Sequence, residues 1–138
     1  MEKSLVLIKP DAVEKNIVGS ILKCYEDYGL KIVALRIGKV EKEFAEIHYK
    51  EHIGKSFYEN LIDFITRSPL CAVVLEGDNC IDKVREINGS TNPKDQKEGT
   101  IRKMYATNMT ENAVHASDSI ESANREIDLW FPEFNDIV

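Results

Sequence analysis

The first apolar residues of the chain form one short run and one helical repeat. Residues 5–8 are continuously apolar and are followed by Lys9-Pro10-Asp11, which predicts a buried strand that stops at a turn. Between residues 17 and 25, apolar side chains recur every three or four positions before Gly29, which predicts an amphipathic helix that ends at the glycine. Lys9 is therefore expected at the end of a strand.

The middle of the chain continues this alternation. A strand is predicted over roughly residues 30–40, with Val33, Leu35 and Ile37 sharing one face. The same periodicities predict further elements, which are helices over residues 42–50 and 58–65, a strand over 70–75 and a helix over 79–87.

Residues 88–100, NGSTNPKDQKEGT, are too polar and too rich in turn formers for a regular element. A loop of this length in a compact domain is usually functional. A short strand is expected after it, ending near Val114. Asp118 with Glu121 three residues later is a capping signature, which predicts the start of a last helix there.

Strands that alternate with helices in this number predict an α+β fold. The expected architecture is ferredoxin-like, with helices that cover one face of a mainly antiparallel sheet. No repeat, linker or low-complexity segment divides the chain, so residues 1–138 are expected to form a single domain.

Composition narrows the classes of partner. The formal charge of -6 argues against sequence-independent binding to nucleic acid or to an anionic membrane, because both need broad positive surface. The three cysteines are widely spaced and suggest neither a disulfide framework nor a zinc knuckle. The apolar run before Lys9 is too short for a signal peptide or a membrane span, so a cytoplasmic location is expected.

The segment HYKEHIGKS at residues 48–56 carries fragments of two enzyme signatures, the H-x-x-E-H pattern of zinc peptidases and the Gly-Lys-Ser end of a P-loop. A P-loop needs a glycine where Tyr49 stands, so Gly-Lys-Ser is interpreted as a loop and helix N-cap. His48 and His52 would share a helix face, but a catalytic zinc needs a third protein ligand and none is evident. A solvated helix face is favoured over a zinc site.

A different histidine is the better candidate for chemistry. His115 directly precedes the last predicted helix, and helix N-termini attract phosphate. Lys9, Arg85 and Arg102 lie on elements that an α+β sandwich can bring near it, and the long loop supplies Thr91. Guanidinium groups and threonine hydroxyls hold phosphates well, so we expect a local cationic cleft for a compact polyanion such as a nucleotide.

Segments along nearly the whole chain resemble the nucleoside diphosphate kinase family in their order and spacing. They are LVLIKPDAV at the start, HYKEH with Phe57, EGDN through GSTNP, GTIR, NAVHASDSIESA, and Glu126 before LWF. This agreement is far more specific than the fragments in residues 48–56.

The resemblance implies transfer of the γ-phosphate from a nucleoside triphosphate to a nucleoside diphosphate by a ping-pong mechanism, with His115 carrying the phosphoryl group. Neutral imidazole is a good nucleophile near pH 7, and a covalent intermediate divides the transfer into two similar steps. The resemblance also implies the following roles: Arg85, Thr91 and Arg102 hold phosphates, Lys9 and Asn112 contact the sugar hydroxyls and the phosphate region, Phe57 covers the base, Glu126 and Ser117 fix the histidine ring, and Tyr49 stands beside the transferred phosphate.

The resemblance further implies Mg²⁺ that is carried on the nucleotide phosphates, with Glu51 reaching it through water. Broad base tolerance and self-association as a homotetramer or homohexamer are also implied. Ala116 stands where the family usually has glycine, so a positive φ at this position would be strained.

Two other classes of function are less well supported. An inactive binding member of the family would be expected to lack His115 or a phosphate-holding residue, and none is missing. A sequence-specific RNA-binding domain needs exposed aromatic residues on its central strands, and the apolar runs at 5–8 and 70–75 contain none. Phosphoryl transfer is the favoured function.

Overall fold

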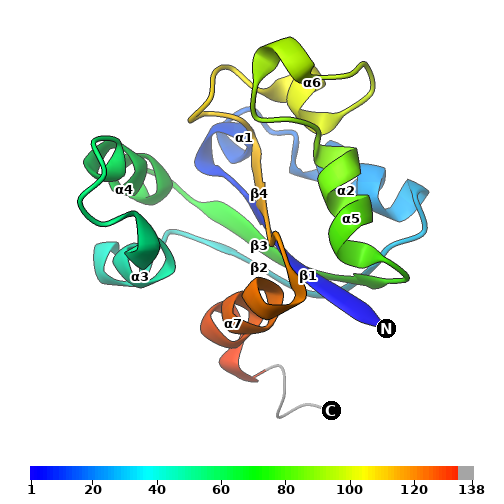
Figure 1. The fold of residues 1–138 in the computed structure, drawn as a ribbon, viewed down its shortest axis with the longest axis horizontal. Coiled ribbons are helices and arrows are strands. Elements are labelled where there is room, and N and C mark those ends of the chain that lie inside the picture. The colour runs from blue at the N-terminus through cyan, green and yellow to red at the C-terminus, as the bar shows by residue number, and fades with distance from the viewer. Residues whose placement is uncertain (134–138) are drawn as a thin grey trace.

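A computed structural model describes residues 1–133, which form a four-stranded antiparallel sheet surrounded by helices (Figure 1). The strands are β1 Glu2–Ile8, β2 Lys31–Gly38, β3 Leu70–Gly77 and β4 Val114–Ala116, in the spatial order β2-β3-β1-β4. The helices are α1 Pro10–Glu14, α2 Val18–Asp27, α3 Lys42–His48, α4 Tyr58–Thr66, α5 Cys80–Asn88, α6 Ile101–Tyr105 and α7 Ile120–Trp130, with 3-10 turns η1 Lys50–His52 and η2 Pro93–Asp95. The α+β, ferredoxin-like class is confirmed, and residues 134–138 of the predicted domain lie outside the described part.

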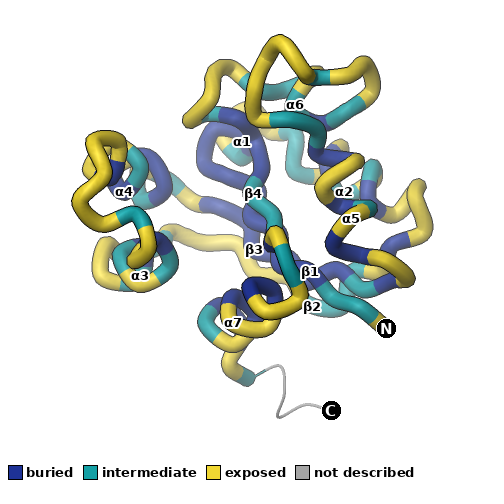
Figure 2. The backbone as a smooth tube through the Cα atoms, in the orientation of Figure 1, coloured by how far each residue is buried: buried dark blue, intermediate teal, exposed yellow. Residues whose placement is uncertain are grey.

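Helices cover both faces of the sheet, and not one face as expected. In β1, Val6 and Ile8 pack into a core with α2 and α5, whereas Leu5 and Leu7 pack into a second core with α3, α4 and α7. Figure 2 shows the central strands as buried between these two layers. The physical reason is visible in the sequence, because a continuously apolar strand is buried on both faces, whereas a strand with one solvated face alternates.

Strand β2 departs from the predicted alternation. Its pairing with β3 shifts register between Ile32 and Ala34, so Val33 is bulged and packs on the α3 and α4 side. Leu35, which lies opposite Val73, consequently belongs to the other face of the sheet. The expectation that Val33 and Leu35 share one face is wrong, because a bulge inserts one residue and reverses the alternation after it.

Two short helices were not expected from the sequence. Pro10 begins α1 immediately after β1, a position where its missing N–H costs nothing, so the predicted turn is one helical turn instead. Thr100 caps α6 by accepting a hydrogen bond from the N–H of Lys103. Within residues 1–133, no helix has both the length and the hydrophobicity that crossing a membrane requires.

The last helix begins near the predicted position but with different capping residues. Ser119 is the N-cap of α7, and its hydroxyl accepts from the N–H of Ser122 at 3.0 Å. The hydroxyl of Ser122 accepts in return from the N–H of Ser119 at 3.0 Å. The capping box is therefore Ser119 with Ser122, and the prediction of Asp118 with Glu121 is wrong by one residue.

This correction gives a test of stability. Ser119→Ala should lower the free energy of unfolding by about 1 kcal/mol, because the N–H of Ser122 in the first turn of α7 loses its side-chain acceptor. Thermal melting followed by circular dichroism would measure the loss, and Glu121→Ala, at the neighbouring position, is the matched control. A larger loss in Glu121→Ala than in Ser119→Ala would contradict the assignment.

Candidate active site

His115 lies in β4, at the edge of the sheet, where it is paired with Leu7 of β1. Its Nε2 is 3.0 Å from Oε1 of Glu126, a residue of α7 that is 6% exposed. The hydroxyl of Ser117 donates to the same carboxylate oxygen at 3.1 Å, and the N–H of Leu5 donates to that hydroxyl. The carboxylate that holds the histidine ring is thus anchored to both α7 and β1.

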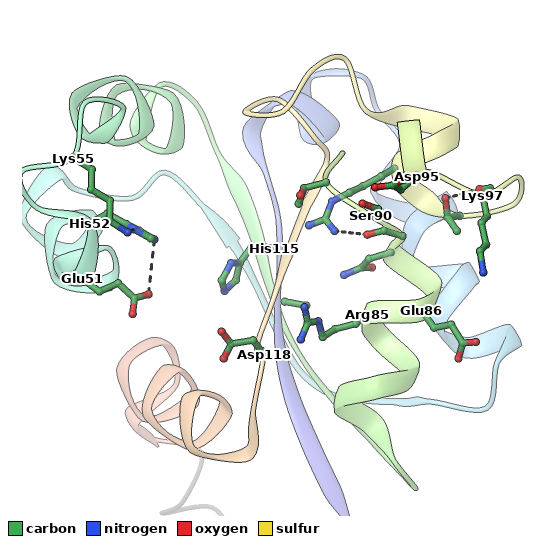
Figure 3. A pocket seen from close by; sticks show the side chains of 16 residues that line it. Glu51, His52, Lys55, Arg85, Glu86, Ser90, Asp95, Lys97, His115 and Asp118 are labelled. Atoms are coloured by element: carbon green, nitrogen blue, oxygen red, sulfur yellow. Dashed lines mark hydrogen bonds and ion pairs between the residues drawn. The ribbon is translucent and has the colours of Figure 1, made fainter. Parts of the chain in front are cut away.

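A cavity of about 880 Å³ opens in front of His115, and 16 residues line it (Figure 3). Glu51, His52 and Lys55 lie on one side of the histidine, and Arg85 and the long loop lie on the other. The lining residues are Glu51, His52, Lys55, Arg85, Glu86, Asn88, Gly89, Ser90, Thr91, Asp95, Lys97, Thr100, Arg102, His115, Ala116 and Asp118. Nδ1 of His115 has no hydrogen-bond partner within residues 1–133 and is the ring nitrogen not held by Glu126.

The structure brings three predicted phosphate-holding residues, Arg85, Thr91 and Arg102, into the lining of this cavity. Arg85 is exposed on α5 and has no hydrogen-bond or ion-pair partner within residues 1–133. Arg102 donates to the carbonyl of Gly89 at 2.6 Å and to that of Val114 at 2.7 Å. Arg102 therefore ties the loop to β4, while Arg85 is free to meet an anion.

The lining is less cationic than the sequence suggested. It contains four Lys or Arg side chains and four Asp or Glu side chains, namely Lys55, Arg85, Lys97 and Arg102 against Glu51, Glu86, Asp95 and Asp118. The whole chain has 18 basic against 24 acidic residues, so the cavity is still more positive than the protein as a whole. Arginine can also bind an anion through two parallel hydrogen bonds, which makes its geometry as important as the net charge.

Lys9 and Asn112 are near His115 in the fold but do not line the cavity. Lys9 is 7% exposed and its Nζ donates to Oδ1 of Asn112 at 2.9 Å. The pKa of Lys9 is lowered to about 8, mainly by burial and to a smaller extent by the neighbouring charge of Arg102, while Asp11 opposes the shift. Lys9 is therefore a cation that its surroundings disfavour, and an added anion would stabilise its charge.

The H-x-x-E-H segment does not form a metal site. His48 ends α3 and accepts a hydrogen bond at its Nδ1 from the indole of Trp130, whereas His52 lies in η1 with its Nδ1 2.9 Å from Nζ of Lys55. No group of three metal-ligating side chains exists anywhere in the described residues 1–133. The zinc interpretation is not supported in this part of the chain.

Two aromatic side chains predicted at the site lie beside it. Tyr49 is 6% exposed, and its ring centroid is 4.6 Å from that of His48. Phe57 is 47% exposed, next to the lining residues His52 and Lys55, with 5.5 Å between the Phe57 and His52 ring centroids. Phe57 is thus positioned to contact a ligand that extends out of the cavity.

Some lining residues escaped the sequence argument. Lys55 was interpreted as part of a loop and N-cap, yet α4 has Phe57 as its N-cap, with no side-chain hydrogen bond, and Lys55 faces the cavity. Asp118 was interpreted as a helix cap and also lines the cavity. The Gly-Lys-Ser fragment at residues 54–56 resembles the end of a phosphate-binding loop, which was the one signal for an anion at this place. Whether the side chain of Lys55 points into the cavity depends on how η1 packs, which the sequence does not show.

Backbone strain lies close to the histidine but not at Ala116. Ala116 is in β4 without a positive φ, so the substitution for glycine is accommodated. Ala113 instead has a φ of 75°, and its N–H donates to Oδ2 of Asp11 at 3.0 Å. A non-glycine residue in this region is uncommon and is a frequent feature of functional sites.

Comparison with known proteins places this geometry in a family. The family model described as Nucleoside diphosphate kinase matches residues 2–135. A nucleoside diphosphate kinase of Clostridium perfringens is 59% identical over 133 residues, covering 96% of this chain and 93% of the relative. One from Listeria monocytogenes is 51% identical over 131 residues, covering 95% of this chain and 89% of the relative.

Solved structures agree with these relatives. The nucleoside diphosphate kinase of Aquifex aeolicus has a TM-score of 0.91 at 38% identity and covers 94% of both chains. The enzyme of Halobacterium salinarum, solved in complex with CDP, has a TM-score of 0.90 at 37% identity and covers 94% of this chain and 87% of its own. The chain belongs to the nucleoside diphosphate kinase family, enzymes that transfer phosphate between nucleoside triphosphates and diphosphates.

Proposed function

We propose that this protein transfers the γ-phosphate of a nucleoside triphosphate to His115 and then to a nucleoside diphosphate, in a ping-pong reaction. The observation that carries the proposal is the pair of His115 nitrogens, with Nε2 held 3.0 Å from Glu126 and Nδ1 without a partner in residues 1–133. The ring lines a cavity that also contains Arg85 and Arg102. A nucleophile held by one nitrogen and open at the other is suited to covalent catalysis.

In the first half-reaction, the lone pair of Nδ1 forms a bond to the γ-phosphorus while the bond from that phosphorus to the bridging oxygen breaks. The nucleoside diphosphate leaves with that electron pair. The imidazole keeps its proton on Nε2 and gains positive charge, which the carboxylate of Glu126 stabilises from 3.0 Å. The second half-reaction reverses these changes with a different nucleoside diphosphate in the same site.

Positioning and charge neutralisation supply most of the catalysis in phosphoryl transfer. Arg85 and Thr91 would hold the phosphates from α5 and the long loop, and Arg102 would add a guanidinium at the base of that loop. The terminal nitrogens of Arg102 already donate to the carbonyls of Gly89 and Val114, so its contribution to the phosphates would be mainly its charge. The CDP complex of the Halobacterium salinarum enzyme supports a nucleotide ligand for the same fold.

The sugar and base would extend from the phosphates towards Lys9, Asn112 and Phe57. Lys9 and Asn112 are joined at 2.9 Å and would meet the sugar hydroxyls and the phosphate region. Tyr49, packed against His48, would stand beside the transferred phosphate. The half-exposed ring of Phe57 would stack on the base, a contact that every base can make.

The cavity fits a magnesium ion that arrives with the nucleotide better than a resident metal. Glu51 and Asp118 offer carboxylate oxygens at the lining, but residues 1–133 contain no group of three ligands. Mg²⁺ keeps several waters and binds phosphates readily, so Glu51 would reach it through water. When bound, the ion neutralises charge on the phosphates.

Self-association as a homotetramer or homohexamer is also proposed. The outer strand β2 carries Leu35 and Ile37, which are 47% and 56% exposed. Apolar side chains on an unpaired sheet edge favour association with another chain. The predicted cytoplasmic location stays a prediction.

The phosphoenzyme is the most direct test of the proposal. Incubation with ATP labelled in the γ-phosphate, followed by denaturing electrophoresis, should label the parent protein. Phosphohistidine is a phosphoramidate, so the label should survive alkali and be lost in mild acid. His115→Ala should take up no label, whereas His52→Ala, which changes another histidine of the lining, should still be labelled. Equal labelling of His115→Ala and the parent would refute the mechanism.

The pKa of Lys9 makes nucleotide affinity depend on pH. With a pKa of about 8, Lys9 is charged below that pH and becomes neutral above it, so the attraction for a diphosphate is lost as pH rises. The Kd for ADP, measured by calorimetry, should rise by up to about tenfold between pH 8 and pH 9. Lys9→Met should bind more weakly and show a flat profile, whereas Lys23→Met on the exposed surface of α2 should behave as the parent.

Base tolerance tests the role of Phe57. Adenine, guanine, cytosine and uracil nucleotides should differ by no more than about a hundredfold in kcat/KM, because stacking contributes about 1–3 kcal/mol to any base. Phe57→Ala should weaken all four together, with purines affected somewhat more, and should still form the phosphoenzyme at high nucleotide concentration. Strict selection of one base by the parent, or a fall in melting temperature with unchanged kinetics in Phe57→Ala, would contradict the assignment.

A further inference from the structure

A second histidine lies directly against His115. The ring of His48, at the end of α3, has its centroid 5.0 Å from that of His115, and the two planes meet at 79°. In this edge-to-face arrangement the imidazole of His48 packs directly against the imidazole of His115. None of the roles assigned so far uses His48.

The His48 ring is itself held in place. The indole Nε1 of Trp130 donates to Nδ1 of His48 at 3.0 Å, and an indole N–H can only donate. The nitrogen facing the indole must therefore be unprotonated, which fixes the tautomer of a neutral His48 ring with its proton on Nε2. Phe44 packs against Trp130 with ring centroids 4.7 Å apart and supports the indole from α3.

His48 also remains uncharged. The pKa of His48 is lowered to about 3, mainly by burial, with smaller contributions from its basic neighbours His115, Arg125, Lys9 and His52. A neutral ring at this position adds no positive charge beside His115. This is favourable because the His115 ring itself becomes positive as it accepts the phosphoryl group.

Within residues 1–133, the bond between Nε2 and Glu126 is the only hydrogen bond that resists rotation of the His115 ring. Rotation about the last side-chain torsion would break that bond and present other ring atoms to the cavity, and torsions of this kind are broad in energy. The ring of His48, packed against the His115 ring, supplies a second constraint on this rotation.

We infer that His48 is a positioning residue, which holds the ring of His115 so that Nδ1, and not Nε2, faces the nucleotide. This inference rests on the proposed phosphohistidine mechanism. It separates the roles of two contacts, since Glu126 holds a nitrogen and His48 limits the rotation of the ring.

Two substitutions separate the ring of His48 from its hydrogen bond. His48→Ala and His48→Phe both remove the acceptor of the Trp130 indole, but only His48→Ala removes the ring beside His115. Phe44→Leu is the matched control, because Phe44 contacts Trp130 and makes no ring contact with His115.

Rapid mixing with saturating ATP measures the rate of phosphoenzyme formation, and phosphorus NMR of the denatured, alkaline phosphoenzyme identifies the isomer. We expect His48→Ala to slow phosphorylation by about 10- to 100-fold at unchanged nucleotide Kd, as a small misplacement of a reacting group can do, and to yield some Nε2-phosphohistidine. His48→Phe should recover most of the rate and the single Nδ1 isomer, and Phe44→Leu should match the parent. Parental rate and isomer in His48→Ala, or equal losses in the alanine and phenylalanine variants, would overturn the inference.

A second readout does not depend on phosphorylation. Nitrogen-15 NMR of the nucleotide-free protein distinguishes imidazole tautomers, and the chain has only three histidines to assign. His115 should have its proton on Nε2 in the parent and in His48→Phe, and a mixture of tautomers in His48→Ala. Unchanged tautomers in His48→Ala would overturn the positioning role, whether or not the parent forms a phosphoenzyme. Failure of the parent to form a phosphoenzyme would refute the proposed function by itself.

Discussion

The short antiparallel pairing of β4 with β1 is the constraint on which the site depends. It sets Leu7 opposite His115, and its ends are closed by the hydrogen bonds from Lys9 N–H to the Ala113 carbonyl and from Ser117 N–H to the Leu5 carbonyl. A three-residue strand has little stability of its own, so these closing bonds and the adjacent side-chain contacts must hold it. A shift of one residue would turn His115 to the opposite face, away from Glu126.

The two hydrophobic layers meet at this edge of the sheet, and each brings one wall of the cavity. α5 packs on one face through Val84 and Ile87 and carries Arg85, while α3 packs on the other face through Ala45 and leads into η1 with Glu51 and His52. The core residues thus fix the distance between Arg85 on one wall of the cavity and Glu51 and His52 on the other. The same two-sided packing buries both faces of the central strands β1 and β3.

The spacing of apolar residues predicted much of the fold, because buried positions are mostly occupied by apolar side chains and their period differs between helices and strands. The apolar run at residues 5–8 lies within β1, which begins three residues earlier at Glu2, and the periodicity over residues 17–25 corresponds to most of α2. The bulge at Val33 was not predictable, since it depends on how β2 and β3 align and leaves no signal in the composition of β2. The unbroken apolar run in β1 indicates a strand that is buried on both faces. The order of the elements, however, predicted a sheet with helices on one face only.

The site was less predictable than the fold from the residues alone. Residue chemistry suggested His115 with Arg85 and Arg102, but the roles of Phe57 and Asn112 came from the resemblance to the family. The sequence did not show the direction of each side chain: Lys55 lies in the loop between η1 and α4 and lines the cavity, whereas Lys9, at the end of β1, does not. The contact between His48 and His115, 67 positions apart in the chain, depends on α3, α7 and β4 being packed together.

Unfavourable local features are concentrated around His115, and this argues that they serve function. Ala113 has a positive φ, an arrangement that costs about 1–3 kcal/mol, and the Asp11 carboxylate that holds its N–H is itself buried. The buried side-chain polar atoms without a partner in residues 1–133 belong to Asp11, Asn88 and Arg102, and the last two line the cavity. Lys9 adds a buried cation whose charge the fold disfavours. Each of these features destabilises the fold. A bound polyanion would stabilise the charge of Lys9, so binding of a nucleotide can restore part of the stability that is lost here.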